Sequence, residues 1–140
     1  MKQIQLAGPL LLGDSIDYLI NYVKKEDFSV INQFYVIAIF LIYENFLDRD
    51  NFIAKLKESS HLPISIIIFI LGDNQIDLDN IQAIYNEHKE ESIRKNIIIT
   101  NFHDIYKNLV RVKLSFEVIF RPIENSILKE ISNQVKNCYK

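Results

Sequence analysis

The chain has 140 residues, a formal net charge of −2 and a hydrophobic content of 49%. This length fits one domain, and the apolar content excludes a disordered chain, because enough side chains can be buried to offset the loss of chain entropy. The balanced charge excludes an electrostatic nucleic-acid binder, and the single cysteine excludes an internal disulfide framework and a cysteine-rich zinc site.

The hydrophobic pattern predicts alternating helices and strands. Helical spacing of apolar residues indicates helices, and uninterrupted runs rich in isoleucine and valine indicate strands buried on both faces. The helices are expected at 14–24, 50–60, 78–91 and from residue 124 onward, and the strands at 34–42, 64–71 and 96–100. The apolar runs are shorter than the roughly 20 residues that span a membrane.

Details of these segments give further expectations. Asp14 or Ser15 is expected to cap the first helix. The last helix is expected to bury Ile127, Leu128, Ile131 and Val135. Aromatic residues fall on apolar faces, which favours a role in the core over base stacking.

Strands that alternate with helices predict an α/β fold with a parallel sheet and crossover helices. One segment differs, because apolar and polar residues alternate along Val110–Phe120. A period of two is typical of a strand with one wet face. We therefore predict an added edge strand near 110–120.

Motifs that carry chemistry are scarce. The sequence has no nucleophile elbow, no phosphate-binding glycine loop and no paired zinc-binding histidines. His61 and His88 are expected at the surface, and helix capping is favoured over calcium binding for the acidic group Asp73, Asp77 and Asp79. Cys138 is expected to be an ordinary, partly exposed thiol. An enzyme stays open as an alternative, with Glu44, Asp73 and His103 following the predicted strands.

Four stretches resemble the copine family, in its C-terminal von Willebrand factor A-like domain. The most specific is SHLPISIII at residues 60–68, which is similar to the family's SKLPMSIII strand entry. The others are residues 5–9 with 16–23, residues 34–39, and residues 127–135 with Tyr139. Residues 103–121 match least. The resemblance implies that residues 1–140 form a single domain with a partial von Willebrand factor A-like, Rossmann-like three-layer sandwich.

The resemblance also implies a metal-ion-dependent adhesion site, which binds a divalent ion through oxygen ligands. Here the family's threonine position is Leu10, and its aspartate position is Ile42 or Tyr43. The one Asp-x-Ser sequence, at residues 27–29, lies in the wrong context. We therefore expect a degenerate site, with no bound metal and no cofactor. The alternative is a surviving Mg²⁺ or Ca²⁺ adhesion site that uses Asp14, Glu44 or Asp48.

The resemblance implies a non-catalytic protein-interaction module whose partners are proteins. Calcium-dependent phospholipid binding in copines belongs to other domains, so membrane association is expected only indirectly. We expect a cytoplasmic protein, with the inner face of the plasma membrane as the alternative. The family's first strands have no counterpart here, which would leave the 34–42 strand with a free edge that could join two copies. A truncated gene product without activity of its own is the remaining alternative.

Overall fold

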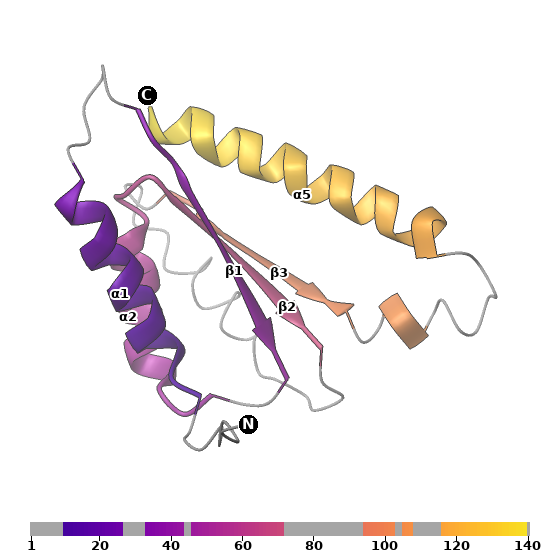
Figure 1. Ribbon diagram of the computed structural model, residues 1–140, viewed down its shortest axis with the longest axis horizontal. Helices are drawn as coiled ribbons and strands as arrows, with labels where there is room; N and C mark the ends of the chain where they lie inside the picture. The colour runs from indigo at the N-terminus through magenta and orange to yellow at the C-terminus, as the bar shows by residue number, and fades with distance from the viewer. Residues whose placement is uncertain are drawn as a thin grey trace, which may run out of the picture.

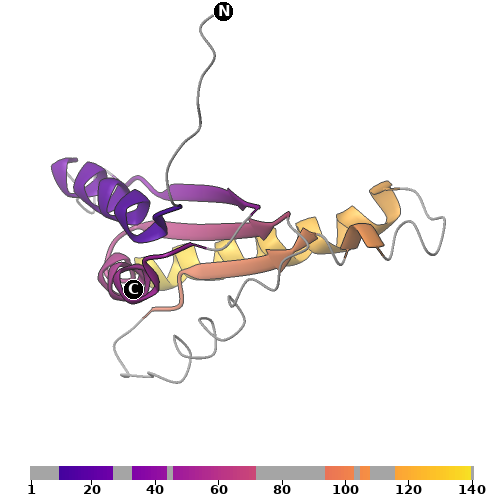
Figure 2. The ribbon, with the colours of Figure 1, turned by 90° about the horizontal axis from the view of Figure 1, so that it is seen from below.

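The computed structural model describes residues 10–26, 33–43, 46–71, 94–102, 105–107 and 116–139. Within these residues the chain forms a mixed α/β fold, with an open parallel sheet in the order β1-β2-β3. The strands are β1 (Val36–Ile42), β2 (Ile64–Ile70) and β3 (Ile97–Asn101), and the helices are α1 (Leu12–Lys25), α2 (Arg49–Ser59) and α5 (Phe116–Cys138). Helices α1 and α2 cover one face of the sheet, and α5 lies on the other (Figures 1 and 2).

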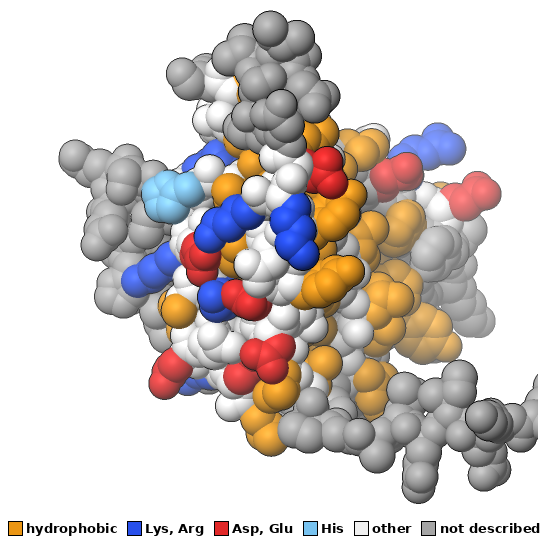
Figure 3. Space-filling model, turned by 60° about the vertical axis from the view of Figure 1, so that its left-hand side comes forward, with side chains coloured by type: hydrophobic (Ala, Val, Ile, Leu, Met, Phe, Trp, Pro, Cys, Tyr) orange, Lys and Arg blue, Asp and Glu red, His pale blue; other side chains and the backbone are white. Residues whose placement is uncertain are grey.

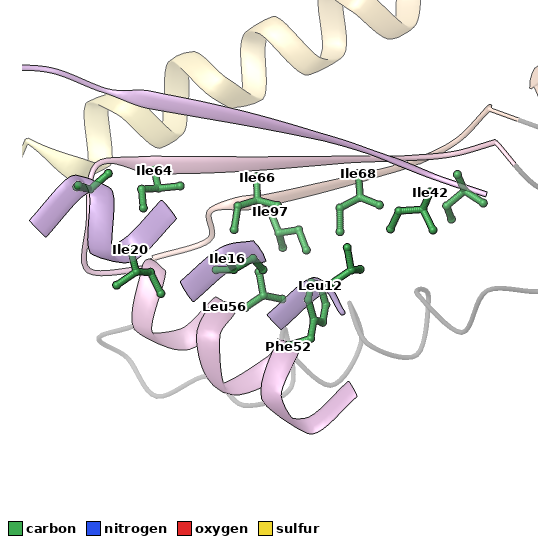
Figure 4. Packing of buried hydrophobic residues seen from close by; sticks show 12 residues of the cluster. Leu12, Ile16, Ile20, Ile42, Phe52, Leu56, Ile64, Ile66, Ile68 and Ile97 are labelled. Atoms are coloured by element: carbon green, nitrogen blue, oxygen red, sulfur yellow. The ribbon is translucent and has the colours of Figure 1, made fainter. Parts of the chain in front are cut away.

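The core lies between the sheet and the pair α1 and α2. Even-numbered isoleucines of β2 point toward these helices, because successive strand side chains alternate between faces. They meet a stripe of apolar side chains on α1 and two further side chains from α2 (Figure 4). The α1 stripe is Leu12, Ile16, Ile20 and Val23, and the α2 residues are Phe52 and Leu56.

Helix α5 is held to the opposite face mainly near its C-terminal end. Ser65, which points away from the core, donates a hydrogen bond to Oε1 of Gln134 at 2.5 Å. Tyr139, just beyond the helix, donates to the carbonyl oxygen of Phe34 at 2.7 Å. Toward its N-terminal end, α5 runs along β2 and β3 rather than β1 (Figure 2).

The parallel sheet and most element positions confirm the predictions. Strands expected at 34–42, 64–71 and 96–100 lie at Val36–Ile42, Ile64–Ile70 and Ile97–Asn101, and the first two helices also lie where expected. The helix expected at 78–91 falls outside the described residues. No helix in the described part of the chain is both long enough and apolar enough to cross a membrane.

The edge strand predicted near 110–120 is wrong where the structure describes it. Residues from Phe116 onward belong to α5, and 110–115 lie outside the described ranges. From Phe120 onward the partly buried apolar residues are spaced by three or four, and they therefore lie on one side of the helix. These residues are Phe120, Ile123, Ile127 and Ile131. Leu128 is 56% exposed, and Ile127, Ile131 and Val135 are half-buried, which corrects the expectation that all four are buried.

The expectation of two strands buried on both faces is confirmed for β2 and wrong for β1. All seven residues of β2 are buried except Phe69, which is half-buried. Strand β1 instead alternates between half-buried and exposed residues until Ile42. The reason is position, because β2 is central whereas β1 lies at the border of the described sheet.

Candidate functional site

The positions matched to a metal site lie at the carboxyl end of β1 and just before α1. Ile42 is 1% exposed and packs in the core, whereas Tyr43 is 73% exposed. Leu10 is half-buried, and its carbonyl oxygen already accepts a hydrogen bond from the Leu47 N–H at 3.2 Å. These side chains provide no carboxylate at this end of the strands.

Asp48, one of the alternative metal ligands, caps a helix. Its Oδ1 accepts the N–H of Leu12 at 2.9 Å, and its Oδ2 accepts the N–H of Gly13 at 2.7 Å. The first N–H groups of a helix lack partners within the helix, and a carboxylate there also interacts favourably with the helix dipole. The expectation that Asp14 or Ser15 caps α1 is therefore wrong, since a distant residue supplies the oxygens.

Gly13 allows the close approach of α2 to the start of α1. A Cβ atom at Gly13 would lie 2.5 Å from Nδ2 of Asn51 and 2.7 Å from Oδ2 of Asp48. Asn51 in turn donates to Oδ1 of Asp14 at 3.2 Å. Both carboxylates of the alternative metal set that the structure describes thus take part in the α1–α2 junction.

The described ranges contain no group of three or more His, Cys, Asp or Glu side chains placed to hold a metal ion. The third member of the alternative metal set, Glu44, lies outside the described residues. Asp73 and His103 also lie outside the described residues, so the structure does not show whether the three residues of the enzyme alternative come together. His88, Asp77, Asp79 and residues 27–29 are also outside them. His61 is exposed, as predicted.

A surface ion-pair network joins α1 to α2. Lys55 contacts Asp17 at 2.5 Å and Glu58 at 3.1 Å, and Lys24 contacts Glu58 at 2.7 Å. Hydrogen bonds from Lys24 and then Lys55 lower the pKa of Glu58, and those to Asp17 and Glu58 raise the pKa of Lys55. Exposed pairs of this kind stabilise modestly, so the network fixes helix packing rather than forming a reactive site.

Arg94, which precedes β3, is a structural residue that no motif in the sequence signals. Its guanidinium donates to the carbonyl oxygens of Leu62 at 2.5 Å, Ile64 at 2.9 Å and Ser60 at 3.2 Å, where the chain enters β2. It also donates to the carbonyl oxygen of Gln134 in α5 at 3.3 Å. An arginine with this many oxygen partners from separate segments acts as a clamp.

A directed chain of hydrogen bonds continues from this clamp into α5. Arg94 donates to Oη of Tyr35 at 2.9 Å, and Tyr35 lies 2.8 Å from Oγ of Ser65. Because the Ser65 hydroxyl donates to Gln134, the Tyr35 hydroxyl is the donor to Ser65. This series of hydrogen bonds lies at the amino ends of the parallel strands, whereas ligand sites of such sheets lie at the carboxyl ends.

Two C-terminal residues also adjoin this polar cluster. Burial raises the pKa of the half-buried Cys138 thiol, which lowers its thiolate fraction. Burial also raises the pKa of Tyr139. Neither group is activated as a nucleophile, and the cluster serves to hold α5 against the sheet.

The uncovered surface of β1 is the strongest candidate for a functional site. Side chains on its α5-facing side are exposed by 47% at Ile37, 59% at Ile39 and 67% at Leu41, followed by 73% at Tyr43. The exposed fraction rises along the strand as α5 diverges from it (Figure 1). Isolated apolar residues at a surface are ordinary, but a continuous row of them marks an interaction surface.

On the other side of β1, a groove of ≈420 Å³ separates the strand from α1. It is lined by Ser15, Tyr18 and Leu19 of the helix and by residues 38–40 of the strand. Tyr18 is 73% exposed and Tyr22 50% exposed, which corrects the expectation that aromatic residues lie in the core. In Figure 3 hydrophobic side chains gather beside the charged surface on this side of the molecule. The spacing of apolar residues in the sequence could not predict this exposed surface, because spacing does not show which strand lies at an edge.

A larger hollow of ≈570 Å³ lies between β3 and the N-terminal half of α5. Isoleucines from both elements line it, and Lys95 and Glu130 form an ion pair of 3.9 Å beside them. Its size suits a small ligand. Its polar groups are partly exposed surface residues, so it is a weaker candidate than the β1 surface.

Comparison with known proteins gives no relative, since no family model, curated protein or solved structure matches the chain.

Proposed function

We propose that this chain is a non-catalytic protein-interaction domain that binds its partner at the free edge of β1. The observation that carries the proposal is the row Ile37, Ile39, Leu41 and Tyr43, which combines exposed apolar side chains with an edge position in the described sheet. A strand edge offers backbone hydrogen bonds to another chain, and alternate side chains supply specificity.

The composition of β1 supports this role. Sheet edges that stay in water are normally protected by charged residues, proline or a bulge. Residues 33–43 contain neither a charged residue nor a proline, and the register of β1 with β2 is uninterrupted. A strand built like an interior strand but placed at an edge is suited to pairing.

The copine resemblance is compatible with this function and adds a more specific proposal. The chain would be a von Willebrand factor A-like domain whose adhesion site has lost its metal ligands at Leu10, Ile42 and Tyr43. Partner binding would then use the sheet edge in place of a metal ion. Membrane association would be indirect, through the partner.

Site-specific photocrosslinking tests the proposal. A photoreactive amino acid replaces Ile39 in cells that express the full chain, and the same replacement at Leu128 is the matched control, because the two side chains are 59% and 56% exposed. We expect discrete protein adducts from position 39 and fewer from position 128. Equal or absent adducts at the two positions contradict binding at this edge.

A metal titration separates the proposal from the alternative adhesion site. An ion that binds only the folded state stabilises that state by an amount that grows with the concentration of the ion. We expect the same thermal unfolding temperature in EDTA, excess Mg²⁺ and excess Ca²⁺, because the carboxylate of Asp48 is engaged with α1. A rise of several degrees with either ion supports the adhesion site instead.

A further inference from the structure

We infer that the partner at the β1 edge is a second copy of this chain, paired antiparallel about a two-fold axis near Ile39. This inference rests on the proposed function of that edge and names its occupant. The second copy is argued from the outward backbone groups of β1 and from the charge distribution of α1.

The backbone of β1 has a defined outward set of hydrogen-bonding groups. The N–H of Val36 donates to Pro63 O at 2.8 Å, and Ile42 O accepts from the Leu71 N–H at 2.7 Å. In a parallel pair, alternate residues bond to the neighbour, so the even-numbered residues of β1 face β2. The N–H and C=O groups of Ile37, Ile39 and Leu41 therefore point to the free edge.

An axis at Ile39 pairs these groups with themselves. Ile39 then lies opposite Ile39 of the second copy, and Ile37 lies opposite its Leu41. Each such antiparallel pair exchanges two hydrogen bonds. The exposed side chains of the same residues form one apolar strip across the two strands, as in other cross-strand pairs.

Helix α1 fits an antiparallel arrangement of two copies. An axis normal to the sheet keeps the two α1 helices on the same face and runs them in opposite directions. Ser15, Tyr18 and Leu19 line the groove beside residues 38–40, so this side of α1 borders the axis. The two helices would meet near Tyr18, with the groove of each copy facing the other.

The charges of α1 are self-complementary in that arrangement. Its first turn carries the exposed carboxylate of Asp14, which keeps its negative charge while Oδ1 accepts from Asn51, and its last turn carries the exposed ammonium of Lys25. Antiparallel helices bring the acidic start of one to within about one turn of the basic end of the other, at about 1.5 Å of rise per residue. The same surface patch serves both copies, as two-fold interfaces require.

The test measures oligomeric state by sedimentation equilibrium and light scattering over a range of concentrations. We expect the wild-type chain to form dimers, Ile39→Lys to be monomeric because it places a charge on the edge, and Leu128→Lys to remain dimeric. Ile39 and Leu128 are similarly exposed, so thermal melts of the two variants should show similar folding. A dimer that survives Ile39→Lys overturns the proposed geometry.

Charge reversal tests the orientation of the helices. Asp14→Lys and Lys25→Asp should each weaken dimerisation by roughly tenfold, because like charges then face each other. The double variant should recover to within about threefold of wild type, since the attraction is restored with exchanged signs. Absence of recovery in a folded double variant overturns the antiparallel arrangement of α1.

Failure of this inference is distinguishable from failure of the proposed function. A chain that is monomeric at every concentration overturns the second copy as partner. If position 39 still crosslinks to a different protein in cells, the interaction function stands with another occupant.

Discussion

Replacing Asp48 with alanine should destabilise the fold at one identifiable place, the start of α1. The carboxylate accepts hydrogen bonds from the N–H groups of Leu12 and Gly13 at 2.9 and 2.7 Å. Asp48 also precedes α2, where its carbonyl oxygen accepts from the Phe52 N–H at 2.8 Å. Alanine preserves that backbone bond, so the change isolates the contact with α1.

The magnitude follows from two contributions. Loss of a capping side chain costs typically about 1 kcal/mol and at most about 2 kcal/mol. Loss of a negative charge near a helix N-terminus adds about 0.3–1 kcal/mol. Since the contact is part-buried and uses both carboxylate oxygens, we expect a loss of about 2 kcal/mol in the free energy of unfolding.

Urea denaturation monitored by circular dichroism measures this loss. Asp48→Asn, which keeps one acceptor oxygen but not the charge, should lose about half as much. Asp50→Ala is the matched control, because it removes an exposed carboxylate from the first turn of α2 without breaking the cap on α1, and it should cost less than about 1 kcal/mol. If Asp48→Ala and Asp50→Ala are equally stable, the cap does not contribute as reasoned.

The remaining predictions concern packing, the clamp and pH. Gly13→Ala should destabilise by about 1 kcal/mol in urea melts despite the higher helix propensity of alanine, because its Cβ would crowd Asn51 and the capping carboxylate; a more stable variant contradicts this. Arg94→Lys should cost about 2–3 kcal/mol, since a lysine cannot reproduce the forked donors to the carbonyl oxygens; an unchanged unfolding midpoint argues against the clamp. The lowered pKa of Glu58 stabilises the fold above its ordinary value of 4.5, and this part is lost as pH falls through the lower folded-state value, so Glu58→Gln should flatten the acid limb of stability against pH. The raised pKa of Lys55 stabilises the fold at pH values below its ordinary value of 10.5, and this contribution is lost as pH rises through the higher folded-state value. The free energy of unfolding should therefore fall with alkaline pH in wild type and fall less in Lys55→Met.

Local patterns were sufficient to locate the strands and the first two helices. Turn residues follow the apolar runs and Pro63 precedes the second one, so the observed strand bounds differ by only a few residues from those expected. Helical spacing predicted the helix at 14–24, and the apolar residues Ile16, Ile20 and Val23 of that helix are all buried. Burial on one side of a helix or strand is a short-range property, and sequence spacing reports it well.

Tertiary position accounts for what the sequence did not show. Strands β1 and β2 have similar apolar runs, yet only β2 is central, and nothing in the composition of a run states its place in the sheet. The start of α5 alternates between apolar and polar residues as a strand does, although Phe120 and Ile123 also fit a helical stripe. Short segments satisfy both periods, and contacts elsewhere decide between them.

The polar contacts that position the helices around the sheet depended even more on residues far apart in the sequence. Asp48 caps a helix that begins far earlier in the chain, and Arg94 reaches Tyr35 and Gln134 in other elements. Single polar residues without a local motif give no signal of such pairings. The metal-site positions could be checked against the structure because the family resemblance named them. No motif or resemblance named Arg94.

The clamp and the exposed edge follow from one arrangement of α5. Gln134 joins the end of the helix to β2 through Ser65. Tyr139, the residue after the helix, bonds to the chain just before β1. From that anchored end α5 diverges from β1, and the exposed fraction of the β1 side chains rises from 47% at Ile37 to 73% at Tyr43. A helix laid along β1 would bury the same row and leave the edge without an apolar surface. The polar contacts at the amino ends of the strands therefore have a consequence at the opposite end of β1, because they anchor the helix whose divergence leaves this row of side chains exposed.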